Sequence, residues 1–310
     1  MRVIVTGGAG FIGSHVAEAL CATGHHVYVL DDLSTGRREN VPDGAVFVEG
    51  DVRDEALVED LFRDVRPDAV VHQAAQTSVT VSVREPRRDA DVNIGGTVVL
   101  LEAARRHGVA RFVFASTGGA IYGEVPEGTR AEIGWPERPE SPYGIGKLAA
   151  EHYVRAATGP IPHTAILRYA NVYGPRQDPH GEAGVVAIFT ERLLDGAPVT
   201  IYGMAEAGDG GCVRDYVFVG DVVDANLAAL AGRLAAPVVH VATGVGTRTS
   251  DLLAALERHF GPASQVVHAP PRPGDLGRSV LAPCPDLAAP TPLDEGLAAT
   301  VAWFRAQRER

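Results

Sequence analysis

A single lysine stands out among the residues that could do acid–base chemistry. The chain has 28 basic side chains, and all of them except Lys147 are arginine. Lys147 follows Tyr143 by four residues in a segment that begins with Ser141 and Pro142, residue types that are typical of a helix N-cap and a first helical position. The two side chains are therefore expected on one face of a helix. There a compact ammonium could lower the pKa of the phenol, a role that the bulkier guanidinium fills less well. The alternative is an ordinary exposed helix pair.

A glycine turn near the N-terminus is the second feature with chemical meaning. The apolar run 2–6 predicts a strand, and apolar residues at helical spacing predict a helix that continues to about residue 22. Between them, glycines at three-residue spacing let the backbone turn tightly and approach a pyrophosphate at the helix N-terminus. The residues of this turn that we expect to contact a dinucleotide are Gly7, Gly10, Phe11, Ile12 and Gly13.

Acidic residues follow the next two predicted strands. Asp31 and Asp32 come directly after the strand near 27–30. A carboxylate there accepts hydrogen bonds from an adenosine ribose and repels a 2′-phosphate, so the sequence favours NAD over NADP. Asp51 and Val52 follow the next strand and could hold the adenine edge. For Asp31 the alternative is a turn or cap residue, and turn geometry would equally account for Asp51.

The first half of the chain alternates apolar strands with helices. This pattern is typical of a parallel sheet covered on both faces, so we expect an α/β fold with a doubly wound, Rossmann-type sheet. Ligands of such sheets bind beyond the carboxyl ends of the strands. The predicted strands lie near 2–6, 27–30, 45–48, 69–72, 111–115 and 164–168, and the intervening helices include 54–64, 90–107 and 143–157.

After residue 168 the connections become rich in glycine and proline, and the predicted elements shorten. We therefore expect residues 1–168 to form the dinucleotide-binding domain. Residues 169–310 are expected to form a smaller mixed α/β lobe that binds substrate and is partly interleaved with the first domain. The predicted helices of this lobe lie near 185–195, 221–231, 250–259 and 293–307.

Composition limits the partners that the chain can have. The formal net charge is −11 at pH 7 and the arginines form no tract longer than a doublet, which argues against nucleic acid or an anionic membrane as a partner. Cys21, Cys212 and Cys284 are odd in number and lack metal-ligand spacing, so neither a disulfide framework nor a metal site is expected. The sequence has no long apolar stretch and no signal-peptide pattern, so the expected location is the cytoplasm.

The order of these motifs carries a family resemblance that covers nearly the whole chain. The sequence resembles the extended short-chain dehydrogenase/reductase superfamily and, within it, the UDP-glucose 4-epimerase-like sugar-nucleotide enzymes. In chain order the resemblance rests on the glycine turn, Asp31, 72–76, 91–93, Ser116-Thr117 and the Tyr143–Lys147 pair, with support from 33–38, 168–176, 214–217 and 272–275.

The resemblance implies a catalytic group built on Tyr143. In such enzymes the tyrosine acts as a phenolate base, helped by the lysine, here Lys147, and by the positive nicotinamide, because a free phenol with a pKa of about 10 is a poor base near neutral pH. Hydride leaves the sugar C4 for NAD, and the 4-keto sugar then takes it back on its other face, so NAD stays bound. A hydroxyl assists at the sugar oxygen; the local sequence favours Thr117 over Ser116, and both could instead merely end the strand.

The resemblance also assigns residues to the two ligands. Besides the glycine turn, the residues implied to contact NAD are Asp31, Asp32, Asp51, Val52, Ala74, Ala75, Gln76, Asn93, Ser116, Tyr143, Lys147 and Tyr169. The residues implied to contact a UDP-sugar are Thr117, Tyr143, Asn171, Val185, Val186, Tyr202, Arg214, Arg272, Asp275 and Ser279. Arginine forks suit a diphosphate held by an acidic protein, although any one of these arginines could be a surface residue and the valines could be core.

The same resemblance separates the possible reactions. Related 4,6-dehydratases place an Asp-Glu pair shortly after the assisting hydroxyl, and related decarboxylases place a glutamate there, whereas this chain has Gly119 and Ala120. The expected function is therefore NAD-dependent 4-epimerisation of a UDP-hexose, UDP-glucose or UDP-galactose. The alternatives are another sugar-nucleotide epimerase or reductase of the superfamily, and a non-catalytic dinucleotide-sensing regulator, which would have no use for the Tyr143–Lys147 pair.

The quaternary structure is a further expectation from the resemblance. It implies a homodimer in which the helices near 90–107 and 143–157 of each subunit form a four-helix bundle.

The sugar's C2 substituent is the last feature that the resemblance addresses. In similar epimerases a residue shortly after the segment 272–275 borders the hexose, and counting onward gives Ser279. A small side chain there would leave room for an N-acetyl group, so UDP-N-acetylglucosamine is an expected second substrate unless Ser279 points away.

Overall fold

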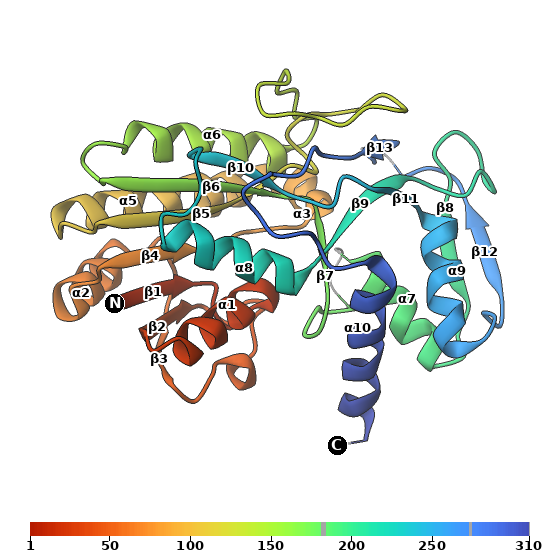
Figure 1. The fold of residues 1–310 in the computed structure, drawn as a ribbon, viewed down its shortest axis with the longest axis horizontal. Coiled ribbons are helices and arrows are strands. Elements are labelled where there is room, and N and C mark those ends of the chain that lie inside the picture. The colour runs from red at the N-terminus through yellow and green to blue at the C-terminus, as the bar shows by residue number, and fades with distance from the viewer. Residues whose placement is uncertain (181–183, 273–274, 310) are drawn as a thin grey trace.

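A seven-stranded sheet forms the larger part of the molecule (Figure 1). The structure, a computed structural model, describes residues 1–180, 184–272 and 275–309. The strand order is β10-β6-β5-β4-β1-β2-β3 and every neighbouring pair is parallel, which confirms the predicted doubly wound arrangement. The strands are β1 (Arg2–Thr6), β2 (His26–Asp31), β3 (Ala45–Glu49), β4 (Ala69–His72), β5 (Arg111–Thr117), β6 (His163–Tyr169) and β10 (Val238–Val241).

Helices cover both faces of this sheet because alternate strand residues point to opposite sides. In β1, Val3 and Val5 belong to one hydrophobic core and Ile4 to the other. Figure 1 shows α1 and α8 side by side over the first of these cores. The first face is covered by α1 (Phe11–Ala22) and α8 (Val219–Leu230), and the second by α2 (Glu55–Val65), α5 (Gly96–Arg106) and α6 (Pro142–Ala156).

The helix that carries the predicted catalytic pair begins where the sequence indicates. The Ser141 hydroxyl accepts a hydrogen bond from the Gly144 N–H at 3.2 Å, and Pro142 is the first helical residue. Together they satisfy a backbone donor and fix the backbone at the start of α6. Tyr143 and Lys147 consequently lie one turn apart in the first half of this helix.

The single helix predicted over 90–107 is divided in the structure. A π-helical turn, η2 (Asp91–Gly95), separates α4 (Pro86–Ala90) from α5. Such turns shift the hydrogen-bond register of a helix and often occur at functional sites. Apolar periodicity does not reveal them, because the helix axis and the buried face continue across the turn. The structure also has a short helix, α3 (Val79–Arg84), and a 3-10 turn, η1 (Arg38–Asn40).

A smaller mixed lobe adjoins the carboxyl ends of the main sheet, and its own core joins α7, α9 and α10. The four helices predicted after residue 168 are all present, each within about two residues of its expected bounds. β10 and α8 come from this half of the chain but join the main sheet, so the two parts are interleaved. The elements of the lobe are β7 (Asn171–Tyr173), α7 (Val185–Leu194), β8 (Val199–Tyr202), β9 (Val213–Phe218), β11 (Gly246–Arg248), α9 (Thr249–Phe260), β12 (Val266–Ala269), β13 (Arg278–Ser279) and α10 (Leu293–Arg308).

A membrane-spanning helix is absent from the described residues, since no helix there combines enough length with enough hydrophobicity.

Candidate active site

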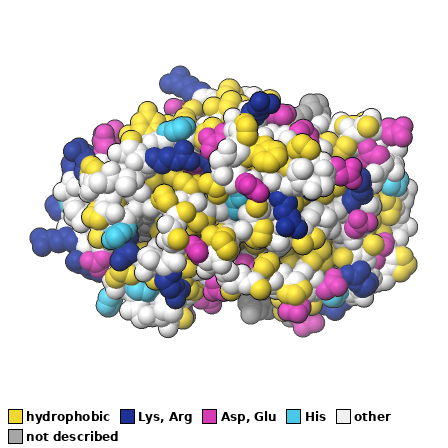
Figure 2. Space-filling model, turned by 45° about the horizontal axis from the view of Figure 1, so that its top comes forward, with side chains coloured by type: hydrophobic (Ala, Val, Ile, Leu, Met, Phe, Trp, Pro, Cys, Tyr) yellow, Lys and Arg dark blue, Asp and Glu magenta, His cyan; other side chains and the backbone are white. Residues whose placement is uncertain are grey.

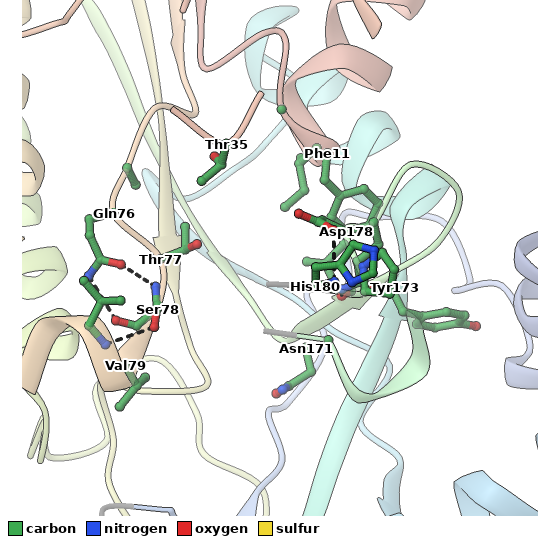
Figure 3. Close-up of a pocket in the computed structure, with 18 of the residues that line it drawn as sticks. Phe11, Thr35, Gln76, Thr77, Ser78, Val79, Asn171, Tyr173, Asp178 and His180 are labelled. Atoms are coloured by element: carbon green, nitrogen blue, oxygen red, sulfur yellow. Dashed lines mark hydrogen bonds between the residues drawn. The ribbon is translucent and has the colours of Figure 1, made fainter. Parts of the chain in front are cut away.

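A large cleft opens where the carboxyl ends of the main strands meet the smaller lobe. Its volume is about 2410 Å³, whereas a pocket for one drug-sized ligand measures roughly 300–1,000 Å³. The cleft is therefore large enough for two ligands of nucleotide size. Figure 3 shows residues 76–79 on one side of the cavity and Phe11, Tyr173, Asp178 and His180 on the other.

The cleft brings together most of the residues predicted from the sequence. The predicted cofactor residues that line it are Gly7, Gly10, Phe11, Ile12, Gly13, Asp31, Asp32, Asp51, Val52, Ala74, Ala75, Gln76, Ser116, Tyr143 and Tyr169. The predicted substrate residues that line it are Thr117, Asn171, Val185, Val186, Tyr202, Arg214, Arg272 and Asp275. Three predicted site residues, Asn93, Lys147 and Ser279, are not among the lining residues. Pro273 and Gly274, which belong to the predicted segment 272–275, lie outside the described residues.

The glycine turn lies against the loop that follows β4. Gly7 has a φ of 66°, and a Cβ atom on it would lie 2.6 Å from the backbone nitrogen of Ala74. A Cβ atom on Gly13 would lie 2.1 Å from the carbonyl oxygen of Gly7. Any larger residue would force these backbone segments apart. The close approach keeps the start of α1 open toward the cleft, where its N–H groups can meet a phosphate.

Asp31 is fixed at the edge of this turn. Its side chain is buried, and its carboxylate oxygens accept hydrogen bonds from the backbone N–H groups of Ala9 and Leu33, both at 2.9 Å. Burial raises the pKa of Asp31, and the backbone hydrogen bonds oppose that shift. Asp51, farther along the same wall, is paired with Arg53, and this hydrogen bond lowers the pKa of Asp51. The acidic residues therefore hold fixed positions on the cofactor side.

Asn93 supports the cleft wall from behind. It is buried, its Oδ1 accepts a hydrogen bond from the Gln76 N–H at 3.0 Å, and its Nδ2 donates to the Gln76 carbonyl at 3.0 Å. Both hydrogen-bonding groups of the Gln76 backbone are thus held by one side chain on the π turn. In the structure Asn93 supports the loop and does not line the cavity.

Tyr143 faces the cleft from α6 and is half-buried. Burial raises the pKa of Tyr143 to about 12, and a hydrogen bond with Thr117 opposes this effect. Lys147 is buried, and its Nζ donates to the Ala115 carbonyl at 2.8 Å and lies 4.8 Å from the centre of the Phe114 ring. For the protein groups alone the pKa of Tyr143 is therefore raised, first by burial and further by the negative charge of Asp89.

The hydroxyl expected beside Tyr143 belongs to Thr117. Ser116, the other candidate, also lines the cleft, but its hydroxyl donates a buried hydrogen bond to the Glu151 Oε1 at 2.6 Å. Glu151 also accepts from Arg168, whose Nε lies 2.8 Å from Oε1 and whose Nη2 lies 2.6 Å from Oε2. Both ionic side chains are almost completely buried.

This buried ion pair was not predicted from the sequence. Glu151 lies four residues after Lys147 on the same helix face, so an acidic residue on that face was the signal available. Bidentate pairing with Arg168 compensates the burial of the two charges. The pair connects α6 to β6, and the hydrogen bond from Ser116 adds β5, so α6 is held in register with the sheet.

Two other cleft residues were also missed. The Tyr216 hydroxyl and the Gln177 Oε1 are buried, both residues line the cleft, and within the described part of the chain neither atom has a hydrogen-bond partner. Tyr216 lies two residues after Arg214 on β9, hence on the same face, and pairs across the strands with Asn171. Strand alternation from Arg214 would have identified it. Unpaired buried polar groups are costly, and a bound ligand can satisfy them.

The predicted substrate side of the cleft is lined by arginines. Arg214 and Arg272 both line it, and the Arg272 guanidinium lies 4.7 Å from the centre of the Tyr202 ring while its Nε donates to Asp275 at 2.8 Å. Ser279 is buried in β13, where its backbone pairs with that of Arg214. The structure therefore places the residue predicted to border the sugar outside the cavity wall.

Comparison with known proteins agrees with this geometry. Residues 3–241 match the NAD dependent epimerase/dehydratase family. A UDP-glucose 4-epimerase from Mycolicibacterium smegmatis is 45% identical over 98% of this chain and 99% of its own length. The UDP-glucose 4-epimerase of Thermus thermophilus in complex with NAD is 55% identical with a TM-score of 0.93, covering 98% of this chain and 99% of that one. The UDP-glucose 4-epimerase of Thermotoga maritima with UDP-glucose is 46% identical with a TM-score of 0.94, covering 99% and 100%. This chain belongs to the NAD dependent epimerase/dehydratase family.

Proposed function

We propose that this protein is an NAD-dependent UDP-hexose 4-epimerase that interconverts UDP-glucose and UDP-galactose. The observation that carries the proposal is the position of Tyr143 and Thr117 in one cleft that has the glycine turn with Asp31 on one side and Arg214 with Arg272 on the other. Relatives with 45–55% identity over nearly the whole chain have this activity.

The residues of the cofactor side fit NAD. The glycine turn leaves no space for a side chain between α1 and the loop after β4, which suits close approach of a pyrophosphate. Asp31 and the support of Gln76 by Asn93 complete that wall. When bound, NAD supplies the hydride acceptor and donor for the sugar C4 and a positive charge that lowers the pKa of the neighbouring phenol.

Tyr143 performs the proton transfer. Its phenolate oxygen takes the proton of the sugar 4-hydroxyl, and the same oxygen returns that proton when the product forms. Thr117 hydrogen-bonds with Tyr143 and so fixes the direction of the phenolic oxygen. Lys147, protonated at neutral pH because its pKa falls only to about 8 on burial, stabilises negative charge on that oxygen.

The arginine side holds the substrate while its sugar turns over. Arg214 and Arg272 suit the diphosphate, because a guanidinium binds phosphate oxygens through paired N–H donors. With the diphosphate held, the 4-keto sugar can present either face to the same reaction centre. The cleft wall at Gly119 and Ala120 carries no carboxylic acid, which disfavours dehydration and decarboxylation.

A substrate panel tests the proposed function. Purified protein would be incubated with UDP-glucose, UDP-N-acetylglucosamine and their dTDP and GDP counterparts, and the epimers resolved by chromatography. We expect UDP-galactose from UDP-glucose without added cofactor. A reduced sugar as product, or no conversion of any UDP-hexose, would contradict the proposal.

Asp31→Ala is expected to weaken NAD binding and to relax the discrimination against NADP. The variant loses a ribose hydrogen-bond acceptor and the negative charge that repels a 2′-phosphate. Cofactor titrations of the stripped protein would measure both affinities, with Asp54→Ala, which alters only the N-cap of α2, as a control for general destabilisation. Unchanged preference between NAD and NADP would remove Asp31 from the cofactor site.

We also propose a homodimer formed through α5 and α6, the helices expected to build the four-helix bundle, with α3 packed beside α6. α3 and α6 expose apolar side chains that a single subunit leaves uncovered: Val83 is 63% exposed, Ile145 53% and Tyr153 51%. Figure 2, which brings the upper side of Figure 1 forward, shows hydrophobic side chains interspersed with acidic and basic ones on the visible surface. Exposed apolar side chains on two adjacent helices favour an interaction surface there.

Light scattering at micromolar concentration is expected to give the mass of a dimer. The double variant Ile145→Glu with Tyr153→Glu should shift the mass toward the monomer, since two buried charges would oppose the interface. Ile133→Glu, at a position that is 50% exposed outside these helices, is the matched control. A monomeric wild-type protein would contradict the proposal.

A role in galactose metabolism and a cytoplasmic location complete the proposal. Cys21, Cys212 and Cys284 are free thiols in the structure, which is typical of a reducing compartment.

A further inference from the structure

A buried carboxylate, Asp89, lies beside the catalytic helix and has no part in the steps above. It belongs to α4 and is 1% exposed. Its Oδ1 accepts hydrogen bonds from the Gln76 Nε2 at 2.7 Å and from the Asn93 Nδ2 at 3.1 Å. Both donors are neutral amides. Burying a carboxylate whose only hydrogen-bond donors are neutral costs free energy. Burial accordingly raises the pKa of Asp89.

The other oxygen of this carboxylate faces α6. A Cβ atom on Gly146 would lie 3.0 Å from the Asp89 Oδ2, so glycine at this position is what allows α4 and α6 to approach so closely. Gly146 directly precedes Lys147 and follows Tyr143 by three residues. One turn of helix therefore carries the contact with Asp89 and both catalytic side chains.

Charges near Lys147 come from three elements. On α6, Glu151 is paired with Arg168 and Arg155, so its charge is largely compensated. On β4, His72 is neutral, since burial lowers its pKa to about 3. On α4, Asp89 is the carboxylate whose charge contributes most to raising the pKa of Lys147 against the lowering by burial.

Asp89 also acts on Tyr143 and on the loop that walls the cofactor side. Its negative charge raises the pKa of Tyr143, after the larger effect of burial. Through the Gln76 side chain it holds the same loop that Asn93 holds through the backbone. A single carboxylate thus touches the cofactor wall on one side and the catalytic helix on the other.

We propose that Asp89 is a positioning residue of this active site, which ties the loop 74–78 to α6 and serves as the buried counter-charge that keeps Lys147 an ammonium beside Tyr143. The proposal rests on the proposed function for the identity of the reaction. The effect of the Asp89 charge on Lys147 and Tyr143, however, concerns only the protein and its bound cofactor.

Asp89→Asn is the decisive variant because it keeps the shape and one oxygen acceptor but removes the charge. Without that charge the pKa of Lys147 falls further, so the ammonium is lost at a lower pH than in the wild type. The pKa of Tyr143 also falls, so the phenolate forms at a lower pH. Both limbs of the pH profile of kcat are therefore expected to move to lower pH.

The experiment compares holoenzymes with two readouts. The first is the pH profile of kcat with UDP-glucose. The second is the ultraviolet titration of the Tyr143 phenolate, obtained by subtracting the spectrum of Tyr143→Phe, which needs no sugar substrate. Asp89→Glu, which keeps the charge, is expected to retain the wild-type limbs at a reduced rate. Asp221→Asn removes a carboxylate that binds Thr291 and does not line the cleft, and it should leave both readouts unmoved.

The outcomes distinguish an electrostatic role of Asp89 from a purely structural one. They also test that role independently of the proposed function. Unmoved limbs and an unmoved phenolate titration in Asp89→Asn, or failure of that variant to fold where Asp221→Asn folds, would overturn the proposal. If the wild type epimerises no UDP-hexose, the phenolate titration still decides the role of Asp89, and a shift to lower pH confined to Asp89→Asn supports it.

Discussion

Tyr143→Phe is expected to lower turnover by about 10²- to 10⁴-fold, the range that a positioned acid–base group contributes. The ring fills the same space, so the packing of α6 and the content of bound NAD should be unchanged. The substitution removes only the oxygen that, in the proposed function, accepts and returns the proton of the sugar 4-hydroxyl. The loss should fall on kcat more than on KM, because the phenolic oxygen acts mainly in the transition state.

The measurement is steady-state kinetics with bound NAD quantified from the same preparation. Tyr153→Phe, which removes the hydroxyl of an exposed tyrosine on the same helix, is the matched control and should keep wild-type turnover. Near wild-type turnover in Tyr143→Phe would show that another group is the base.

Lys147→Arg is expected to lose most activity although the charge is conserved. The ammonium is buried, 2.8 Å from the Ala115 carbonyl and 4.8 Å from the centre of the Phe114 ring. A planar guanidinium is bulkier and cannot take the same position between these groups. An arginine there would push α6 away from β5 or turn its charge elsewhere, and either change moves Tyr143 relative to Thr117.

Lys147→Met provides the comparison, since it removes the charge but fits the space of the lysine stem. If arginine reduces kcat about as strongly as methionine does, the position of the charge is what matters. An arginine variant that kept most of the activity would show that this position does not require lysine. It would then be unexplained why this basic residue alone is not arginine.

The elements of the fold could be predicted because their signals are local. Apolar runs, alternation and the Ser141-Pro142 start place α6 and six strands of the main sheet, β1 to β6, whereas β10 was not predicted. The glycine turn and Asp31 follow from their positions between those elements. The π turn at 91–95 was not predicted, because it changes the hydrogen-bond register of the helix without changing which face is buried.

The contacts within the site could not be predicted from the sequence, because they join residues of separate elements. Glu151 and Arg168 come from separate elements, and no spacing in the sequence reveals that they form a buried ion pair. Ser279 was placed by counting along the chain, but the pairing of β13 with β9 decides where its side chain points. Lys147 and Asn93 do not line the cleft. Each is buried and donates a hydrogen bond to a backbone carbonyl of a strand or loop that does line it.

The most direct test of the central claim follows the hydrogen on the sugar C4. UDP-glucose deuterated at C4 would be converted in ordinary water with no cofactor added, and the product examined by NMR. If oxidation and reduction occur at C4 within one turnover, UDP-galactose should form and keep its deuterium at C4. Hydrogen from the solvent at C4, or conversion that requires added NAD in proportion to product, would contradict the account.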